Sequence, residues 1–313
     1  MNTTIQEIYK KLVSNISNVI FGKEDVIKYV FSAFLSEGHV LLEDVPGTGK
    51  TMLARAFSKS LGLSYKRVQF TPDLLPQDLT GLFVYNQKTQ EFTFYKGPIF
   101  TDILLGDEIN RATPKTQSAL LEAMGEGQVS IEGEKYELSS NFFVIATQNP
   151  IEYEGTFPLP EAQLDRFMMR LSMGYPSKKA ELNMLKSQFF SHPIESIKQI
   201  VSKEEIENAK QEVKEVQIDD SIQEYIVNII SKTRDLRELI IGASPRGTIS
   251  LMKASKALAA IDGRRHCLPD DVKNSVVPVL SHRLILKPET KLKKRTSFDI
   301  LKDILETVEV KLI

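Results

Sequence analysis

The sequence predicts an α/β protein, in which helices flank a parallel sheet, followed by an all-helical C-terminal domain. Continuous apolar runs, such as residues 39–42 and 142–146, alternate with segments of helical periodicity. Such runs are typical of parallel strands that are buried on both faces. Beyond Pro176 helical periodicity dominates, so we predict one domain over residues 1–176 and a helical lid over residues 177–313.

The N-terminal part supplies the sheet and its first helices. Apolar residues spaced three or four apart predict a helix over residues 5–19 and another after Gly22. A strand at 39–42 then leads through a glycine-containing loop into a helix that ends near Leu61. The other strands of the predicted sheet lie at 65–70, 103–105 and 142–146.

Two segments alternate apolar and polar residues around a polar centre, which is the pattern of a β-hairpin. The first, at about 82–94, turns at residues 86–88, and the second, at about 128–138, turns at residues 132–135. Both interrupt the alternation of strands and helices. We therefore predict that they are insertions into the α/β domain.

The C-terminal part carries apolar residues at helical spacing over residues 222–230, 251–261 and 271–280. These three patterns predict the main helices of the lid. The segment 242–247 begins the second of them, with Ser244 as its N-cap and Pro245 in its first turn.

Composition restricts the class of partner and the compartment. The 313 residues include 40 Lys and Arg against 41 Asp and Glu, a net charge of −1, which gives no overall basic field for nucleic acid. The single cysteine, Cys267, excludes an internal disulfide and a cysteine-based zinc site. No apolar stretch is long enough to span a membrane, and the N-terminal residues lack the apolar core of a signal peptide. We expect a cytoplasmic protein without a nucleic-acid partner.

The loop after the first predicted strand has the composition of a phosphate-binding loop. Gly47 and Gly49 permit a tight turn, and the backbone N–H groups at the start of the next helix can bind phosphate oxygens. Lys50 is placed to contact the β- and γ-phosphates, and the Thr51 hydroxyl to bind Mg²⁺. The residues predicted to bind the nucleotide here are Val45, Pro46, Gly47, Thr48, Gly49, Lys50 and Thr51.

Asp44 departs from the common form of this loop, because it stands where the first glycine belongs. A carboxylate facing the phosphates would repel them. We therefore expect the Asp44 side chain to point away from the bound nucleotide.

A second motif, which is acidic, lies about sixty residues downstream of the loop, where an apolar strand ends in Asp107 and Glu108. A carboxylate at the end of that strand can hold the Mg²⁺ shell, and we assign this to Asp107. The neighbouring Glu108 can polarise the water that attacks the γ-phosphate. Together the two motifs predict ATP hydrolysis with Mg²⁺ as cofactor.

Three polar residues complete the predicted site. Asn149 ends the next strand, where its amide can hydrogen-bond the γ-phosphate. Arg246 lies in the first turn of a predicted helix, where the helix dipole disfavours a cation, so a role facing an anion fits it better than a surface ion pair. Arg166 is the third candidate, in the segment 164–167.

These motifs together resemble the MoxR family of AAA+ ATPases. The resemblance extends over nearly the whole chain, and its long strings occur in the family's order. They lie at residues 44–51, 69–76, 97–100, 105–112, 115–124, 146–150, 159–167 and 243–246.

The resemblance implies roles that spacing does not give. Asn149 matches the sensor-1 position, and Arg246 matches sensor 2, which reaches from the lid to the γ-phosphate. Arg166 is similar to the arginine finger, which acts on the ATP of a neighbouring subunit, and Arg170 is a second candidate.

The resemblance also implies the adenine site, the assembly and the partner. Phe21 and Gly22 match the segment that lines the adenine pocket, and the two predicted hairpins match insertions of this branch. Members are similar to chaperones: they form hexameric rings and often act with von Willebrand factor A domain proteins. A homo-hexamer that remodels a protein client is therefore expected.

Three other functions remain open at this point. A nucleic-acid-translocating AAA+ motor would favour basic hairpins, whereas the second hairpin here turns among Glu132 and Glu134. A non-enzymatic, nucleotide-gated scaffold would lack a catalytic group, and none is missing. A magnesium-chelatase-like subunit has a similar architecture, and the identity of its partner would distinguish it.

Overall fold

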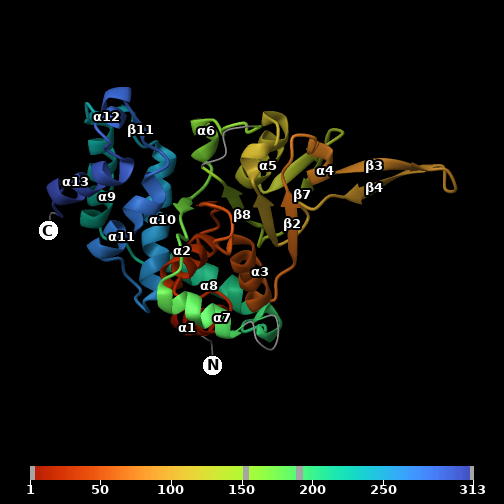
Figure 1. Ribbon diagram of the computed structural model, residues 1–313, viewed down its shortest axis with the longest axis horizontal. Coiled ribbons are helices and arrows are strands. Elements are labelled where there is room, and N and C mark those ends of the chain that lie inside the picture. Colours follow the sequence, from red (N-terminus) through yellow and green to blue (C-terminus); the bar gives the residue numbers. More distant parts are fainter. Residues whose placement is uncertain (1–3, 151–154, 188–192, 311–313) are drawn as a thin grey trace.

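The computed structural model describes residues 4–150, 155–187 and 193–310. At its centre lies a five-stranded sheet in the order β2-β5-β8-β1-β9, in which all neighbouring strands are parallel. The predicted α/β class is therefore confirmed (Figure 1). The strands are β1 (Val40–Glu43), β2 (Tyr65–Gln69), β5 (Ile103–Asp107), β8 (Phe143–Gln148) and β9 (Met169–Leu171).

The strands are buried on both faces because successive side chains point to opposite sides of the sheet. Leu41, Leu104 and Val144 enter one hydrophobic cluster, which α5 (Pro114–Glu126) covers. Leu42, Leu105 and Ile145 enter a second cluster on the opposite face. The helices of that face lie below the sheet in Figure 1 and include α1 (Ile5–Ile16), α2 (Glu24–Leu35), α3 (Lys50–Leu61) and α8 (Lys203–Glu215).

Strand register brings the carboxyl ends of four strands to one edge of the sheet. Gln69 on β2 is level with Asp107 on β5, and Glu43 on β1 is level with Gln148 on β8. Polar residues that end these strands, or follow them directly, are therefore neighbours in space. Open parallel sheets bind ligands at this edge.

The segments predicted as hairpins pair as antiparallel ladders. β3 (Gly81–Asn86) pairs with β4 (Glu91–Lys96), and β6 (Gln128–Ile131) pairs with β7 (Glu134–Glu137). At the base of the first hairpin, the Phe94 ring lies 4.7 Å from that of Tyr136, which joins the two hairpins. The first hairpin then projects well beyond the rest of the molecule (Figure 1).

The C-terminal part is helical, and its helices stand together on one side of the sheet (Figure 1). A short antiparallel ladder between β10 (Leu239–Ile241) and β11 (Ile285–Leu286) is the departure from the all-helical prediction. These strands are three and two residues long, too short for an alternating pattern to reveal them. The helices are α9 (Asp220–Asp235), α10 (Pro245–Ile261), α11 (Pro269–Leu280), α12 (Pro288–Leu292) and α13 (Ser297–Thr307).

Further helical elements complete the described chain. None of the helices in the described ranges is long and apolar enough to cross a bilayer. The domain boundary near Pro176 stays a prediction. The remaining elements are α4 (Pro76–Thr80), η1 (Ile109–Arg111), α5 (Pro114–Glu126), α6 (Glu161–Leu164), α7 (Lys178–Ser187) and η2 (Pro193–Ser196).

Candidate active site

The loop between β1 and α3 has the backbone of an anion cradle. Gly47 and Gly49 have left-handed φ angles of 83° and 92°, which glycine adopts without steric cost. Gly49 is the N-cap of α3, so the first N–H groups of this twelve-residue helix lack partners within the helix. A Cβ atom built on Gly47 would meet no atom within 4 Å, which leaves the approach to these donors open. The loop therefore fits phosphate oxygens, as the sequence predicts.

Asp44 points away from this cradle. Its Oδ2 atom accepts hydrogen bonds from the Gly174 N–H at 2.9 Å, from the Ser172 hydroxyl at 3.1 Å and from the Met173 N–H. The carboxylate thus ties the end of β1 to the turn that follows β9. Because three donors satisfy it on the far side of the strand, an acid can replace glycine here without facing the phosphates.

Lys50 lies inside the curve of the loop. Its Nζ atom donates to the carbonyl oxygen of Asp44 at 2.6 Å and to that of Val45 at 3.4 Å. Burial lowers the pKa of the Lys50 ammonium, and the nearby carboxylates of Asp44, Asp107 and Glu108 oppose this shift. The cation is therefore held where phosphate oxygens can replace carbonyl groups as its acceptors.

Asp107 and Glu108 stand across from the loop, at the end of β5. The Asp107 Oδ2 atom accepts from Arg67 Nη2 at 2.6 Å, and its Oδ1 atom accepts from the Thr147 hydroxyl at 2.6 Å. Glu108 has a left-handed φ of 56°, and its Oε2 atom accepts from Gln69 Nε2 at 2.8 Å and from Arg111 Nη1 at 3.2 Å. Both carboxylates are thus held in defined positions.

The partners that hold these carboxylates were not predicted from the sequence. Arg67 and Gln69 are two residues apart on β2, so their side chains emerge on the same face of the strand, with Gln69 level with Asp107 and Arg67 level with Leu105. Thr147 also accepts a hydrogen bond from the Glu108 N–H at 2.9 Å, so it links β8 to both acids. The polar residues Arg67 and Gln69 on either side of the buried Val68 were the available signal for the first two.

One cavity of about 320 Å³ brings eight of the predicted site residues together. Asn149, which is 5% exposed, lies in its wall beside Thr147. Sequence-distant groups from three strand ends and one helix start therefore converge on a single space. Its wall includes Pro46, Gly47, Gly49, Lys50, Thr51, Asp107, Glu108 and Asn149.

The segment predicted to line the adenine pocket passes beside the loop. A Cβ atom built on Gly49 would lie 3.5 Å from the Cδ1 atom of Ile20, and Phe21 is half-buried. Gly22 lines a second cavity, of about 400 Å³, together with Met173 and with Val277 of α11. Arg170 lines the same cavity, and its guanidinium lies 3.0 Å from the Glu43 carboxylate.

Arg166 and Arg246 lie outside the 320 Å³ cavity, as far as the described residues define it. Arg166 donates through Nη1 to the carbonyl oxygen of Leu121, in the middle of α5. The Arg246 Nη1 atom lies 3.6 Å from Asp165 Oδ2, and its side chain is 54% exposed. The structure therefore brings the two acids and Asn149 to the loop, but not these two arginines.

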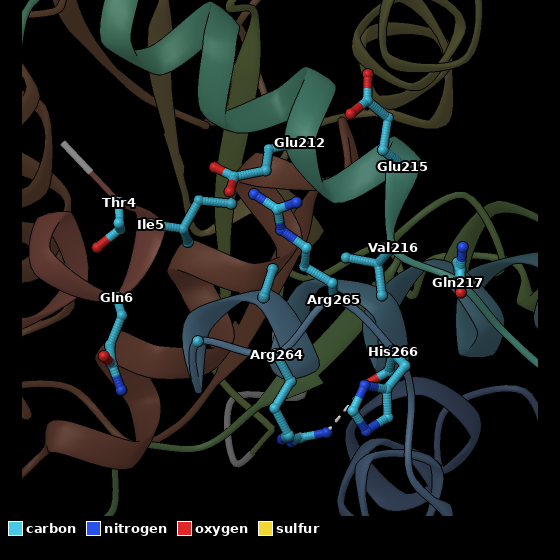
Figure 2. A pocket seen from close by; sticks show the side chains of 12 residues that line it. Thr4, Ile5, Gln6, Glu212, Glu215, Val216, Gln217, Arg264, Arg265 and His266 are labelled. Atoms are coloured by element: carbon cyan, nitrogen blue, oxygen red, sulfur yellow. Dashed lines mark hydrogen bonds between the residues drawn. The ribbon is translucent and has the colours of Figure 1, made fainter. Parts of the chain in front are cut away.

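A cavity of about 560 Å³ lies elsewhere, between the start of α1, the end of α8 and the turn after α10 (Figure 2). Figure 2 shows Arg265 directed toward Glu212, while Arg264 donates to the His266 carbonyl at 3.3 Å. Asp271 also holds Arg264 through two contacts of 2.6 Å. The polar groups of this cavity lie where α1, α8 and the turn after α10 meet. None of the predicted site residues is among its described lining residues.

Comparison with known proteins identifies the family. A family model described as "ATPase family associated with various cellular activities (AAA)" matches residues 39–169, and one of the AAA lid domain matches residues 231–304. Uncharacterized protein YeaC of Bacillus subtilis is 52% identical over 300 residues, which cover 96% of this chain and 94% of YeaC. Chaperone MoxR1 of Mycobacterium tuberculosis is 36% identical over 308 residues, covering 96% of this chain and 81% of that protein.

A solved structure agrees with this placement. A crystal structure described as that of a "putative ATPase" from Cytophaga hutchinsonii matches with a TM-score of 0.91 and 37% sequence identity. The match covers 98% of this chain and 96% of that one. The chain belongs to the MoxR family of AAA+ ATPases.

Proposed function

We propose that the protein hydrolyses ATP in the 320 Å³ cavity. The observation that carries this proposal is the convergence of Lys50, Thr51, Asp107, Glu108 and Asn149 on one space. The phosphates lie over the amides at the start of α3, with Lys50 against the β- and γ-phosphates. The adenine ring lies toward Phe21 and Gly22.

Mg²⁺ fits this cavity through oxygen ligands. The Thr51 hydroxyl and the Asp107 carboxylate both line it, and oxygen donors of this kind suit Mg²⁺. The residues that the structure describes contain no cluster of three or more His, Cys, Asp or Glu side chains that could hold an ion alone. Phosphate oxygens and water are the expected remaining ligands, and the ion supplies positive charge to the phosphates when bound.

Catalysis then depends on positioning and charge, with no covalent intermediate. Glu108 orients the attacking water and accepts its proton, once the carboxylate turns from Gln69 and Arg111 toward the γ-phosphate. Asn149 fixes the γ-phosphate from the next strand. During this turn of the Glu108 side chain, Thr147 holds the backbone of Glu108 and the carboxylate of Asp107 in place through its two hydrogen bonds.

We propose further that the active form is a homo-hexameric ring in which Arg166 completes the site of a neighbouring subunit. Arg166 contacts α5 of its own chain and lies outside its own cavity, which supports action on another subunit. Arg170, in contrast, pairs with Glu43 on the strand that leads into the loop. This contact favours Arg166 over Arg170 as the finger.

The Arg166→Ala variant should lose ATPase activity, because a finger supplied by another subunit contributes roughly 10³- to 10⁵-fold in rate. Activity should return in part when this variant is mixed with Glu108→Gln subunits. A mixed ring then contains sites with an intact Glu108 that face an intact Arg166. Phosphate release, measured across mixing ratios, tests this expectation.

Arg237→Ala is the matched control for this experiment. Arg237 is an exposed arginine between α9 and β10, and its removal should leave activity near that of the unaltered protein. If Arg166→Ala stays inactive at every mixing ratio, the proposal of a shared site is wrong. If Arg166→Ala alone keeps full activity, Arg166 is not the finger.

We propose that ATP hydrolysis remodels a protein client, as the name of the relative Chaperone MoxR1 suggests. The first hairpin exposes apolar side chains, with Phe92 68% and Tyr95 59% exposed, on an element that projects from the body (Figure 1). Such a surface suits a polypeptide better than a phosphate backbone. A von Willebrand factor A domain protein is the partner class that we propose, with a cytoplasmic location.

A further inference from the structure

One carboxylate, Asp165, joins the sheet-bearing part of the chain to two elements of the lid. It lies between α6 and β9, directly before Arg166. Its Oδ1 atom accepts from Arg283 Nε at 2.7 Å. Its Oδ2 atom accepts from the Ser244 hydroxyl at 3.0 Å and lies 3.6 Å from Arg246 Nη1. The start of α10 and the segment after α11 therefore converge on a single side chain.

Arg283 anchors this junction. Its side chain is 1% exposed, and its guanidinium also donates to the carbonyl oxygens of Asp165 at 3.1 Å, Phe167 at 2.8 Å and Met168 at 3.1 Å. A buried guanidinium must have its donors satisfied, and these acceptors do so. Arg283 thus fixes both the Asp165 carboxylate and the backbone on either side of Arg166.

Arg246 is the loosely held partner of the same carboxylate. Its contact of 3.6 Å is longer than the 2.7 Å contact of Arg283, and its side chain is 54% exposed. Burial, with a contribution from Arg283, lowers the pKa of His282, so this neighbour remains neutral. Two guanidinium groups then share one carboxylate, and the junction has one positive charge in excess.

The position of Arg246 explains why it needs an anion. It follows Pro245 in the first turn of α10, which Ser244 caps through the Gly247 N–H. A cation at the start of a helix is unfavourable against the helix dipole unless an anion lies beside it. Asp165 supplies that anion here. The terminal phosphate of ATP, with more negative charge than a carboxylate, is a stronger one.

We propose that Asp165 is a positioning residue. It holds Arg246 away from the nucleotide cavity until the γ-phosphate of ATP replaces Asp165 as the anion beside Arg246. The inference rests on the proposed function, because it requires ATP in that cavity, and on the sensor-2 role that the family resemblance implies for Arg246. Release moves only Arg246, since Arg283 stays bound to Asp165. The pair therefore reduces the apparent affinity for ATP by the fraction of molecules in which Arg246 is held.

A double-mutant cycle isolates this effect. In a Glu108→Gln background, which prevents turnover, Asp165→Asn should tighten ATP binding by about twofold to fivefold, the range that a half-exposed ion pair can contribute. The same change in an Arg246→Ala background should leave the ATP Kd unchanged, because the held residue is gone. Isothermal titration calorimetry measures the four dissociation constants.

Asp271→Asn serves as the matched control. Asp271 is a buried carboxylate that also holds an arginine, Arg264, but it lies outside the junction. Its replacement should lower the melting temperature without changing the ATP Kd. Asp165→Asn should lower the melting temperature in both backgrounds, because Arg283 loses its carboxylate partner in each.

Equal effects of Asp165→Asn in the two backgrounds, or no effect in either, would overturn the inference while leaving ATP binding intact. Absence of ATP binding by the Glu108→Gln protein itself would overturn the proposed function, and the inference with it. If Asp165→Asn does not fold, the unaltered protein crystallised with an ATP analogue gives the answer. The Arg246–Asp165 contact should then be broken and the Arg283–Asp165 contact kept; persistence of both contacts contradicts the inference.

Discussion

Replacing Lys50 by alanine is expected to reduce ATP affinity by roughly a hundredfold, since removing one partner of a hydrogen-bonded charge pair costs about 2–5 kcal/mol. Lys50 is the ammonium group that lines the cavity beside the loop, and it is already held inside the loop's curve. Alanine removes this charge and leaves the backbone donors of α3 in place. Isothermal titration calorimetry with ATP and Mg²⁺ measures the loss.

Lys59→Ala is the control for this variant. Lys59 is in the last turn of the same helix, where its Nζ atom donates to the Ile194 carbonyl at 2.9 Å, outside the cavity. It should bind ATP like the unaltered protein. If Lys50→Ala binds as tightly as Lys59→Ala, the loop is not the phosphate site.

Replacing Glu108 by glutamine is expected to lower kcat by about 10²- to 10⁴-fold, the usual contribution of a general base. Glutamine keeps the size of the side chain and can still accept a hydrogen bond from Gln69, but it cannot take a proton from water. ATP affinity should therefore change little. Steady-state phosphate release and a binding titration separate the two effects.

Glu122→Gln is the matched control, because Glu122 is an exposed acid on α5. It should keep normal turnover, and normal turnover by Glu108→Gln as well would refute the role assigned to Glu108. The stalled Glu108→Gln protein should also retain a client when ATP is present. Equal capture with and without ATP would count against ATP-driven remodelling.

The convergence of Lys50, Asp107 and Asn149 on one cavity could be predicted from the sequence because it is encoded locally. Lys50 follows one strand, Asp107 ends another and Asn149 follows a third. Parallel strands place such residues at one edge of the sheet whatever the details of packing. The phosphate-binding loop could be predicted from its two glycines and the start of α3 alone.

The groups that orient Asp107 and Glu108 could not be predicted, because their positions depend on the register between strands. Arg67 and Gln69 meet Asp107 and Glu108 only because β2 pairs with β5 with Gln69 level with Asp107. The direction of the Asp44 side chain could be predicted only from the repulsion between its carboxylate and the phosphates. Its hydrogen-bond donors lie about 130 residues further along the chain, at the end of β9.

The place of Arg246 is set by the orientation of the lid against the sheet, and that of Arg166 by its long-range contact with α5. That orientation depends on long-range contacts such as the one between Arg283 and Asp165, which no local pattern reveals. The resemblance to a family suggested what the two arginines do when ATP is bound. It did not predict that Arg246 would pair with Asp165 in this structure.

A crystal structure with Mg²⁺ and a non-hydrolysable ATP analogue tests the central claim most directly. We predict the triphosphate over the amides that follow Gly47, with Lys50 against the terminal phosphates, Asp107 facing the ion and Glu108 facing the γ-phosphate. An empty loop, or carboxylates at 107 and 108 that remain turned away from a bound nucleotide, would contradict the account.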